Sequence, residues 1–254
     1  MRKVLVAGVA VCVLYGAPAL AAAPAALYDW SSWYVGLNAG ANWGTANTTT
    51  NLMPGGSFFG ACPGCLADFA SKSNQSIGTS GFTGGVHGGY NWQSGNLLAG
   101  IELDFEYIGN NSTSRYAVGL QTNGGVTTNI KTDWLLTARP RLGVVANNWL
   151  FYGTGGLAVS KMKGSWSYSD TVNAPCDCES ASASTTKAGW TLGGGIETAL
   201  PGGWSVGGEY LYVKFGNVSA SGILTAGFTT QTDVFNHSLD LKSNIVRARF
   251  SKKF

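Results

Sequence analysis

Apolar and polar side chains alternate with a period of two along most of the chain. In the clearest run, Ile101, Leu103 and Phe105 occupy one parity. Glu102 and Asp104 occupy the other parity. Because successive side chains of a strand point to opposite faces, this alternation predicts strands with one apolar face and one small or charged face. The same pattern predicts eight strands, over residues 33–43, 82–92, 97–108, 132–145, 149–160, 187–200, 204–215 and 238–254.

The predicted connections between these strands come in two sizes that alternate along the chain. Tight turns rich in Gly, Asn and Pro are expected at residues 93–96, 146–148 and 201–203. Long polar segments, expected to be loops, cover residues 44–80, 109–130, 161–185 and 217–236. This order places the three short turns and both chain ends at one end of the sheet, with the four long loops at the other. It is the layout of an antiparallel transmembrane barrel with short periplasmic turns and long outer loops.

Composition separates a membrane barrel from a soluble β-sandwich or lipocalin-like barrel. Charged residues make up 11% of the chain and aromatic residues 12%, and 37 glycines argue against a helical protein. A soluble barrel would bury its apolar parity and expose its charged one, yet surface charge is scarce here. Aromatic residues near the ends of the apolar faces fit two interfacial belts. The net charge of +3 without a basic cluster gives no indication of nucleic-acid binding.

The amino terminus has the three parts of a secretory signal. Arg2 and Lys3 precede an apolar run, and small residues end at Ala21. The predicted organisation is therefore a cleaved signal peptide at 1–21, a periplasmic lead-in at 22–32 and a barrel at 33–254. An uncleaved helical anchor is the alternative. Export of a barrel of this layout predicts a location in the bacterial outer membrane.

Several stretches resemble one family. The segments 28–36, 151–158, 209–212 and 244–254 are similar to the porin-like outer-membrane immunogenic proteins of alphaproteobacteria. The resemblance implies an eight-stranded barrel akin to opacity proteins, with lipid, lipopolysaccharide and the outer-membrane insertion machinery as partners. It also implies a carboxyl-terminal assembly signal that includes Phe250 and Phe254. Lys252 departs from the pattern, since the family usually has an aromatic residue there.

The charged parity of the strands predicts what lies inside the barrel. Eight strands enclose an interior wide enough only for side chains or for one small ligand. Unpaired ions in that interior would each cost several kcal/mol, so the opposite charges are expected to pair and fill the lumen. We expect a structural barrel contributing to envelope integrity, with a narrow solute channel as the alternative. The predicted network comprises Glu102, Asp104, Glu106, Asp133, Arg139, Arg141, Lys187, Glu197, Glu209, Arg247 and Arg249.

A barrel enzyme acting on lipid or lipopolysaccharide is a less favoured alternative. His237, Ser238 and Asp240 form the best candidate constellation. Neighbouring strand residues point to opposite faces, so His237 and Ser238 are not expected to share a proton. We expect His237 to be a solvated loop residue and His87 to be an inward polar filler. No catalytic residue, cofactor or metal ion is predicted.

Four cysteines follow the signal peptide and fall in two of the long polar segments. They form a Cys-x-x-Cys pair and a Cys-x-Cys pair, at Cys62, Cys65, Cys176 and Cys178. An exported chain enters an oxidising compartment, which favours loop disulfides over metal binding. Four cysteines allow three pairings, and the sequence leaves them open.

Overall fold

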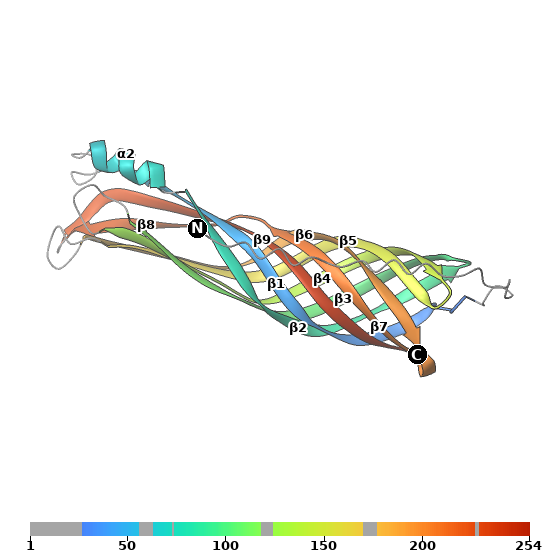
Figure 1. Cartoon of the computed structure of the whole chain (residues 1–254). Coiled ribbons are helices and arrows are strands. Elements are labelled where there is room, and N and C mark those ends of the chain that lie inside the picture. Colours follow the sequence, from blue (N-terminus) through green and yellow to red (C-terminus); the bar gives the residue numbers. More distant parts are fainter. Residues whose placement is uncertain (1–26, 56–62, 73, 118–123, 170–176, 227–228) are drawn as a thin grey trace, which may run out of the picture.

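A computed structural model describes residues 27–55, 63–72, 74–117, 124–169, 177–226 and 229–254 (Figure 1). The predicted signal peptide and the first residues of the lead-in lie outside these ranges. One ten-residue helix, α2, spans Pro63–Lys72. None of the described helices is long and apolar enough to span a bilayer. The strands are β1 (Ser32–Met53), β2 (Asn74–Ser94), β3 (Leu97–Ala117), β4 (Gly125–Ala146), β5 (Trp149–Ser169), β6 (Asp177–Leu200), β7 (Trp204–Phe215), β8 (Val218–Ala226) and β9 (Thr229–Lys253).

The strands form one antiparallel sheet that closes on itself. Each strand from β1 to β6 pairs with the next, and β9 pairs with both β7 and β1. The strand β8 continues the course of β7, because it also lies between β6 and β9. The described sheet therefore has eight positions around the ring, as predicted, with one position divided between β7 and β8. Closure pairs every strand on both sides in the half of the sheet that carries the short turns. Beyond that half, the pairing of β2 with β3 ends at Thr83 and Ile108.

Three tight turns connect strands at the end of the barrel that carries the carboxyl terminus (Figure 1). Gly95 and Asn147 adopt φ values of 61° and 54°, and Gly202 and Gly203 adopt 75° and 77°. Two-residue hairpins require left-handed backbone of this kind, and Gly and Asn adopt it at the lowest cost. The sequence prediction of three short turns is confirmed.

The strands are about twice as long as predicted, because the polar segments expected to be loops are largely strand. Residues 44–53 continue β1, and 109–117 continue β3. The reason is visible in the inward positions of these segments, where Ala46, Ile77 and Ile130 are buried. These segments keep the period of two, with Ser, Thr and Asn instead of apolar side chains on the outward face. Thr also has a high strand propensity.

The outward face is continuously apolar in a band at the turn end of the barrel, and beyond the band Met53 and Ile223 are isolated exposed apolar side chains. Leu37, Leu103 and Leu142 point outward and keep 61%, 62% and 69% of their surface exposed. On β1 the band runs from Trp33 to Trp43. Ten residue steps cover about 33 Å of strand, or about 25 Å along the normal of a membrane crossed at a tilt near 40°. A closed apolar girdle of this height matches a hydrocarbon layer, and β1 beyond it extends outward from the membrane.

An arginine placed in this band should destabilise the folded barrel, whereas one placed on the extension should not. We expect Leu37→Arg to lower the free energy of unfolding by about 2–4 kcal/mol, because the guanidinium would face hydrocarbon. Asn51→Arg lies on the same strand and face but beyond the band, and should change stability by about 0.5 kcal/mol or less. Urea titration in lipid vesicles, read by the heat-dependent shift in electrophoretic mobility, measures both. Equal losses of stability in the two variants would mean that the apolar band does not mark the part of the barrel that faces hydrocarbon.

Candidate functional site: the side chains that fill the barrel

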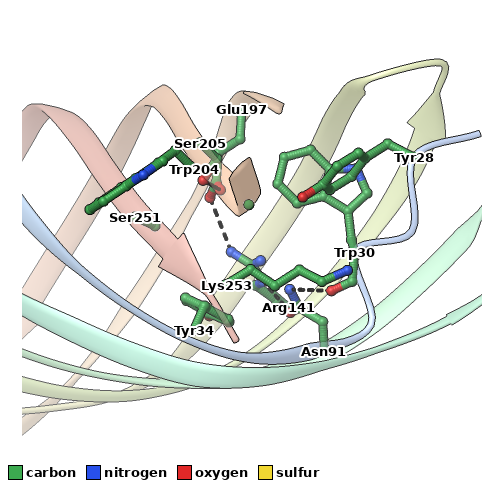
Figure 2. Close-up of a pocket in the computed structure, with 11 residues that line it drawn as sticks. Tyr28, Trp30, Tyr34, Asn91, Arg141, Glu197, Trp204, Ser205, Ser251 and Lys253 are labelled. Carbon is green, nitrogen blue, oxygen red and sulfur yellow. Dashed lines mark hydrogen bonds and ion pairs between the residues drawn. The ribbon is translucent and has the colours of Figure 1, made fainter. Parts of the chain in front are cut away.

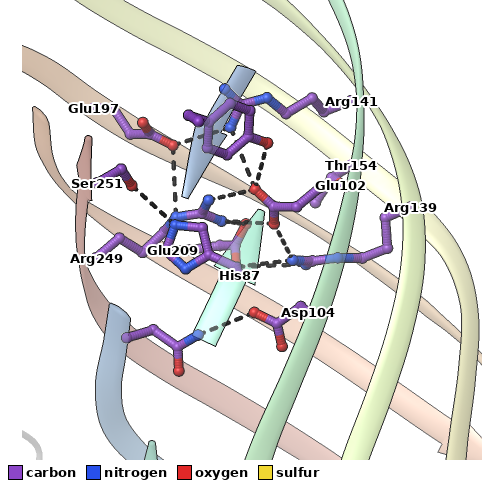
Figure 3. Close-up of polar contacts among 12 residues, drawn as sticks. His87, Glu102, Asp104, Arg139, Arg141, Thr154, Glu197, Glu209, Arg249 and Ser251 are labelled. Carbon is purple, nitrogen blue, oxygen red and sulfur yellow. Dashed lines mark hydrogen bonds and ion pairs between the residues drawn. The ribbon is translucent and has the colours of Figure 1, made fainter. Parts of the chain in front are cut away.

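Arg247 and Arg249 of β9 are at the centre of a buried charged network. Figure 3 shows the part of this network around Arg249 and Glu102. Arg247 contacts Glu209 at 2.6 Å, Glu106 at 2.8 Å and Asp104 at 2.9 Å. Arg249 lies two residues further along the same face and contacts Glu209 at 2.8 Å and also Glu102. Two guanidinium groups therefore join two strands other than their own, because the carboxylates come from β3 and β7.

Arg139 and Arg141 of β4 approach the same carboxylates from the opposite wall. Arg139 contacts Glu102 at 2.6 Å and Glu209 at 3.4 Å. Arg141 contacts Glu197 at 3.1 Å, and its Nε donates a hydrogen bond to the side-chain oxygen of Asn91 at 2.9 Å. The four arginines and the five carboxylates are all buried or nearly so. So many charges can be buried in a small volume because each one lies next to charges of opposite sign.

Neutral side chains complete the coordination of the network. Tyr34 donates a hydrogen bond to Glu102 at 2.8 Å, and Tyr152 donates one to Glu209 at 2.9 Å. The Arg141 guanidinium lies over both rings, 4.7 Å and 5.0 Å from their centroids. His87 faces inward, as expected, and its Nε2 lies 2.9 Å from the Ser251 hydroxyl. The inward face is therefore satisfied largely by the protein's own side chains.

Two residues of the predicted network do not join it. Asp133 instead pairs with Lys131 and Lys163 on the outward face, at 3.2 Å each. The reason is an irregularity in the β4–β5 register between Thr132 and Leu135, which reverses the facing of the residues before it. Lys187 lies opposite Ser160 and is half-buried, and no carboxylate in the described part of the chain pairs with it.

An apolar section that the sequence analysis missed fills the lumen beyond the charged network. Its large side chains include Leu135, Met162 and Leu241, which are fully buried. The missed signal lies in runs that are apolar on both parities, such as residues 210–213 and the pair 245–246. A strand with lipid on one side and an apolar interior on the other carries apolar side chains on both faces. It therefore lacks the alternation of apolar and polar residues by which a strand is predicted from sequence. The section comprises Ala46, Ile77, Ile108, Ile130, Leu135, Ala158, Met162, Trp166, Leu211, Val213, Phe215, Val218, Leu239, Leu241 and Ile245.

The lead-in folds back against the turn end of the barrel (Figure 2). Trp30 is 5% exposed and packs among Leu98, Leu150 and Tyr152. Its backbone N–H donates to the side-chain oxygen of Gln93 at 2.8 Å. A cavity of about 10 Å³ remains between Trp30 and the charged network, which is room for about one water molecule.

At the outer end, His237 points into the barrel and is 1% exposed, so the expectation of a solvated loop histidine is wrong. Its ring stacks on Trp166 at 5.2 Å, and its nitrogens lie 2.8 Å from the Thr50 hydroxyl and 3.3 Å from Glu179. The strand continues through this segment, which turns His237 inward and Ser238 outward. Phe69 of α2 closes this end by packing edge-on against Phe235 at 5.4 Å.

The remaining candidate residues lie outside the lumen. Cys178 is disulfide-bonded, whereas Cys62, Cys176 and the side chain of Cys65 lie outside the described part of the chain. Phe250 points outward and stacks on Trp204 at 4.7 Å. The backbone N–H of Phe254 donates to the carbonyl of Trp33 at 3.1 Å, which ties the last residue to the first strand. Their role as an assembly signal stays a prediction.

A closed antiparallel ring with an apolar girdle and an interior filled by side chains defines an integral outer-membrane β-barrel. The family described as "Outer membrane protein beta-barrel domain" matches residues 12–241. The chain is 33% identical over 243 residues to the 31 kDa outer-membrane immunogenic protein of Brucella melitensis biotype 1, covering 92% of this chain and 87% of the relative. It is 33% identical over 150 residues to the 22 kDa outer membrane protein of Rhizobium leguminosarum bv. viciae, covering 59% and 58%. Neisserial surface protein A aligns with 87% of this chain and 97% of its own, at 12% identity and a TM-score of 0.35.

The chain belongs to this outer-membrane β-barrel family, and its location is the outer membrane. The resemblance noted from the segments at the two ends of the chain is thereby confirmed.

Removing one arginine from the network should destabilise the barrel strongly. We expect Arg247→Gln to lower the free energy of unfolding by about 3–5 kcal/mol, because three carboxylates lose their shared partner. Lys214→Gln removes a positive charge from the outward face and should cost about 0.5 kcal/mol or less. Urea unfolding in detergent micelles measures both changes.

The double variant Arg247→Gln/Glu106→Gln then tests whether the charges act as a unit. Arg247 is the ion-pair partner of Glu106, so the second change should recover part of the loss, with a coupling of about 0.5–3 kcal/mol. Additive losses would mean that the two side chains contribute independently.

Proposed function

We propose that this protein is a structural barrel that anchors a long extracellular extension in the outer membrane and provides no open diffusion pore. The observation that carries the proposal is the succession of fillings along the lumen. From the periplasmic end these are Trp30 with its neighbours, the charged network, the apolar section and the contact between Phe69 and Phe235. A solute would have to displace buried side chains in each of these layers.

The narrow-channel alternative requires a continuous wet path. The apolar section opposes such a path, because its side chains offer no hydrogen-bond partner to water or ions apart from the indole N–H of Trp166, which already donates to Thr48. The cavity beside Trp30 admits about one water molecule, and Arg141 and Glu197 of the charged network form part of its wall. Envelope integrity and display of the extension are the roles that a filled barrel can serve.

The enzyme alternative gains little support from the residues that could perform it. His237 and Glu179 form a buried pair, but both side chains are 0% exposed. Ser238 and Asp240 face outward on the same strand, away from the imidazole. A nucleophile and its base must lie within hydrogen-bond reach of one another. We propose that this cluster is structural and that the protein is not an enzyme.

Conductance measurements on the refolded protein test the sealed lumen. We expect no stable current steps in planar bilayers and no swelling of liposomes in arabinose. The variant Leu211→Ser/Ile245→Ser replaces two facing inward side chains of the apolar section with small polar ones. It should admit water and raise ion leakage, provided that its heat-dependent mobility shift shows a folded barrel. Stable current steps from the unaltered protein would contradict the proposal.

A further inference from the structure

Two lysines face each other across neighbouring strands on the outward surface, just beyond the apolar band. Lys131 of β4 is paired in register with Lys163 of β5. Like charges placed directly opposite on a sheet destabilise it. Their side chains are 53% and 44% exposed, so the arrangement is not forced by burial. Asp133 contacts both ammonium groups and offsets part of their repulsion, so the cluster stands at the surface with a net positive charge.

The surroundings of this pair form a groove of about 370 Å³ that crosses four strands. That volume is within the range of small-molecule sites. Amide and hydroxyl side chains from β3, β4, β5 and β6 line it together with the two lysines, whereas most of the exposed lining surface is carbon. The side chains other than the two lysines include Asn111, Asn129, Ser165, Ser182 and Ser184.

The carboxylate of Asp133 does not occupy all the N–H donors of the two ammonium groups, so some of them remain available for an anion. Asp133 lies 3.2 Å from each ammonium group, so the three residues together carry one net positive charge. Each ammonium group has three N–H donors, and one contact to Asp133 leaves two of them for another acceptor. Lys161 lies on the same outward face of β5, two residues before Lys163, and adds a further positive charge.

The position of the groove along the strands determines which layer of the membrane lies beside it. The last apolar outward residue on β5 is Val159, and Lys163 follows four residues later, about 13 Å further along the strand. On β4, Asp133 is followed directly by Trp134, which belongs to the outer aromatic belt, and then by Leu135. The groove thus lies at the level of the head groups of the outer leaflet, beside the hydrocarbon layer.

We propose that the groove between Lys131 and Lys163 binds the phosphorylated sugar head group of an outer-leaflet glycolipid. The lysines would pair with phosphate, and the serine and asparagine side chains would hydrogen-bond the sugar hydroxyls. A plain anionic phospholipid satisfies only the first of these requirements. The site therefore selects a phosphorylated saccharide over charge alone.

Titration of the refolded mature chain in non-ionic detergent micelles tests the proposal. The probes are bis-phosphorylated lipid A, dephosphorylated lipid A and phosphatidylglycerol, each added in the same micelles, with binding followed by thermophoresis. We expect phosphorylated lipid A to bind at least about ten-fold more tightly than either of the others. Lys131→Gln/Lys163→Gln should remove that preference, because each lysine near an anionic head group contributes about a factor of five.

The chain supplies a matched control at another point of the barrel. Lys214 and Lys242 also face each other, on β7 and β9, just beyond Tyr212. The variant Lys214→Gln/Lys242→Gln removes the same charge from the same kind of pair and should keep the preference. Asp133→Asn should instead tighten binding several-fold, because it removes the internal counter-ion.

Three results would overturn the assignment of this groove. They are equal losses in the two lysine double variants, equal affinity for phosphatidylglycerol, or no binding of lipid A at all. The heat-dependent mobility shift of each variant verifies that the barrel is folded. Asp133→Asn tests the site with an expected gain, which a misfolded protein cannot produce.

Discussion

A backbone that crosses hydrocarbon must pair all its polar groups within the protein, and the rest of this structure depends on that requirement. Pairing closes the sheet, with β9 returning to β1 over twenty consecutive residue pairs from Tyr34 to Met53. Closure then divides every strand into a lipid face and an inward face. Because eight strands leave no room for bulk water, the inward side chains must satisfy one another.

The inward side chains meet this requirement in two chemically different ways. Near the periplasmic end, four arginines share five carboxylates. Glu209, for example, contacts three of the arginines, Arg139, Arg247 and Arg249. Further out, the same inward positions carry Leu, Ile, Val and Met, which need no partner. Ion pairs fix the relative register of distant strands, because a one-residue slip would turn each charge toward lipid. Apolar packing supplies burial without such specificity.

The sequence predicted the ring, the turns and nine of the eleven charged residues that converge inside it. It failed where the period of two is interrupted or masked. Asp133 has the same parity as Arg139, but an irregularity in the strand lies between them and turns it outward. His237 was assigned to a loop because its polar neighbours hide a strand that continues beyond the membrane. The sequence does not predict the apolar section, because its residues, such as Leu135, stand next to other apolar residues and the alternation is lost there. Local irregularities and the chemistry of the interior are set by contacts between distant strands, which one-dimensional patterns do not contain.

The strand extension changes what the outer part of this protein can do. Mobile loops present their side chains in many arrangements, whereas paired strands hold theirs at fixed spacing. Lys131 and Lys163 are held opposite each other by backbone pairing, and Asn111 continues the same row on β3. A rigid row of this kind loses little conformational entropy on binding, so even weak polar contacts contribute to affinity. The long strands that enlarge the apolar interior therefore also preorganise the polar surface at the membrane edge.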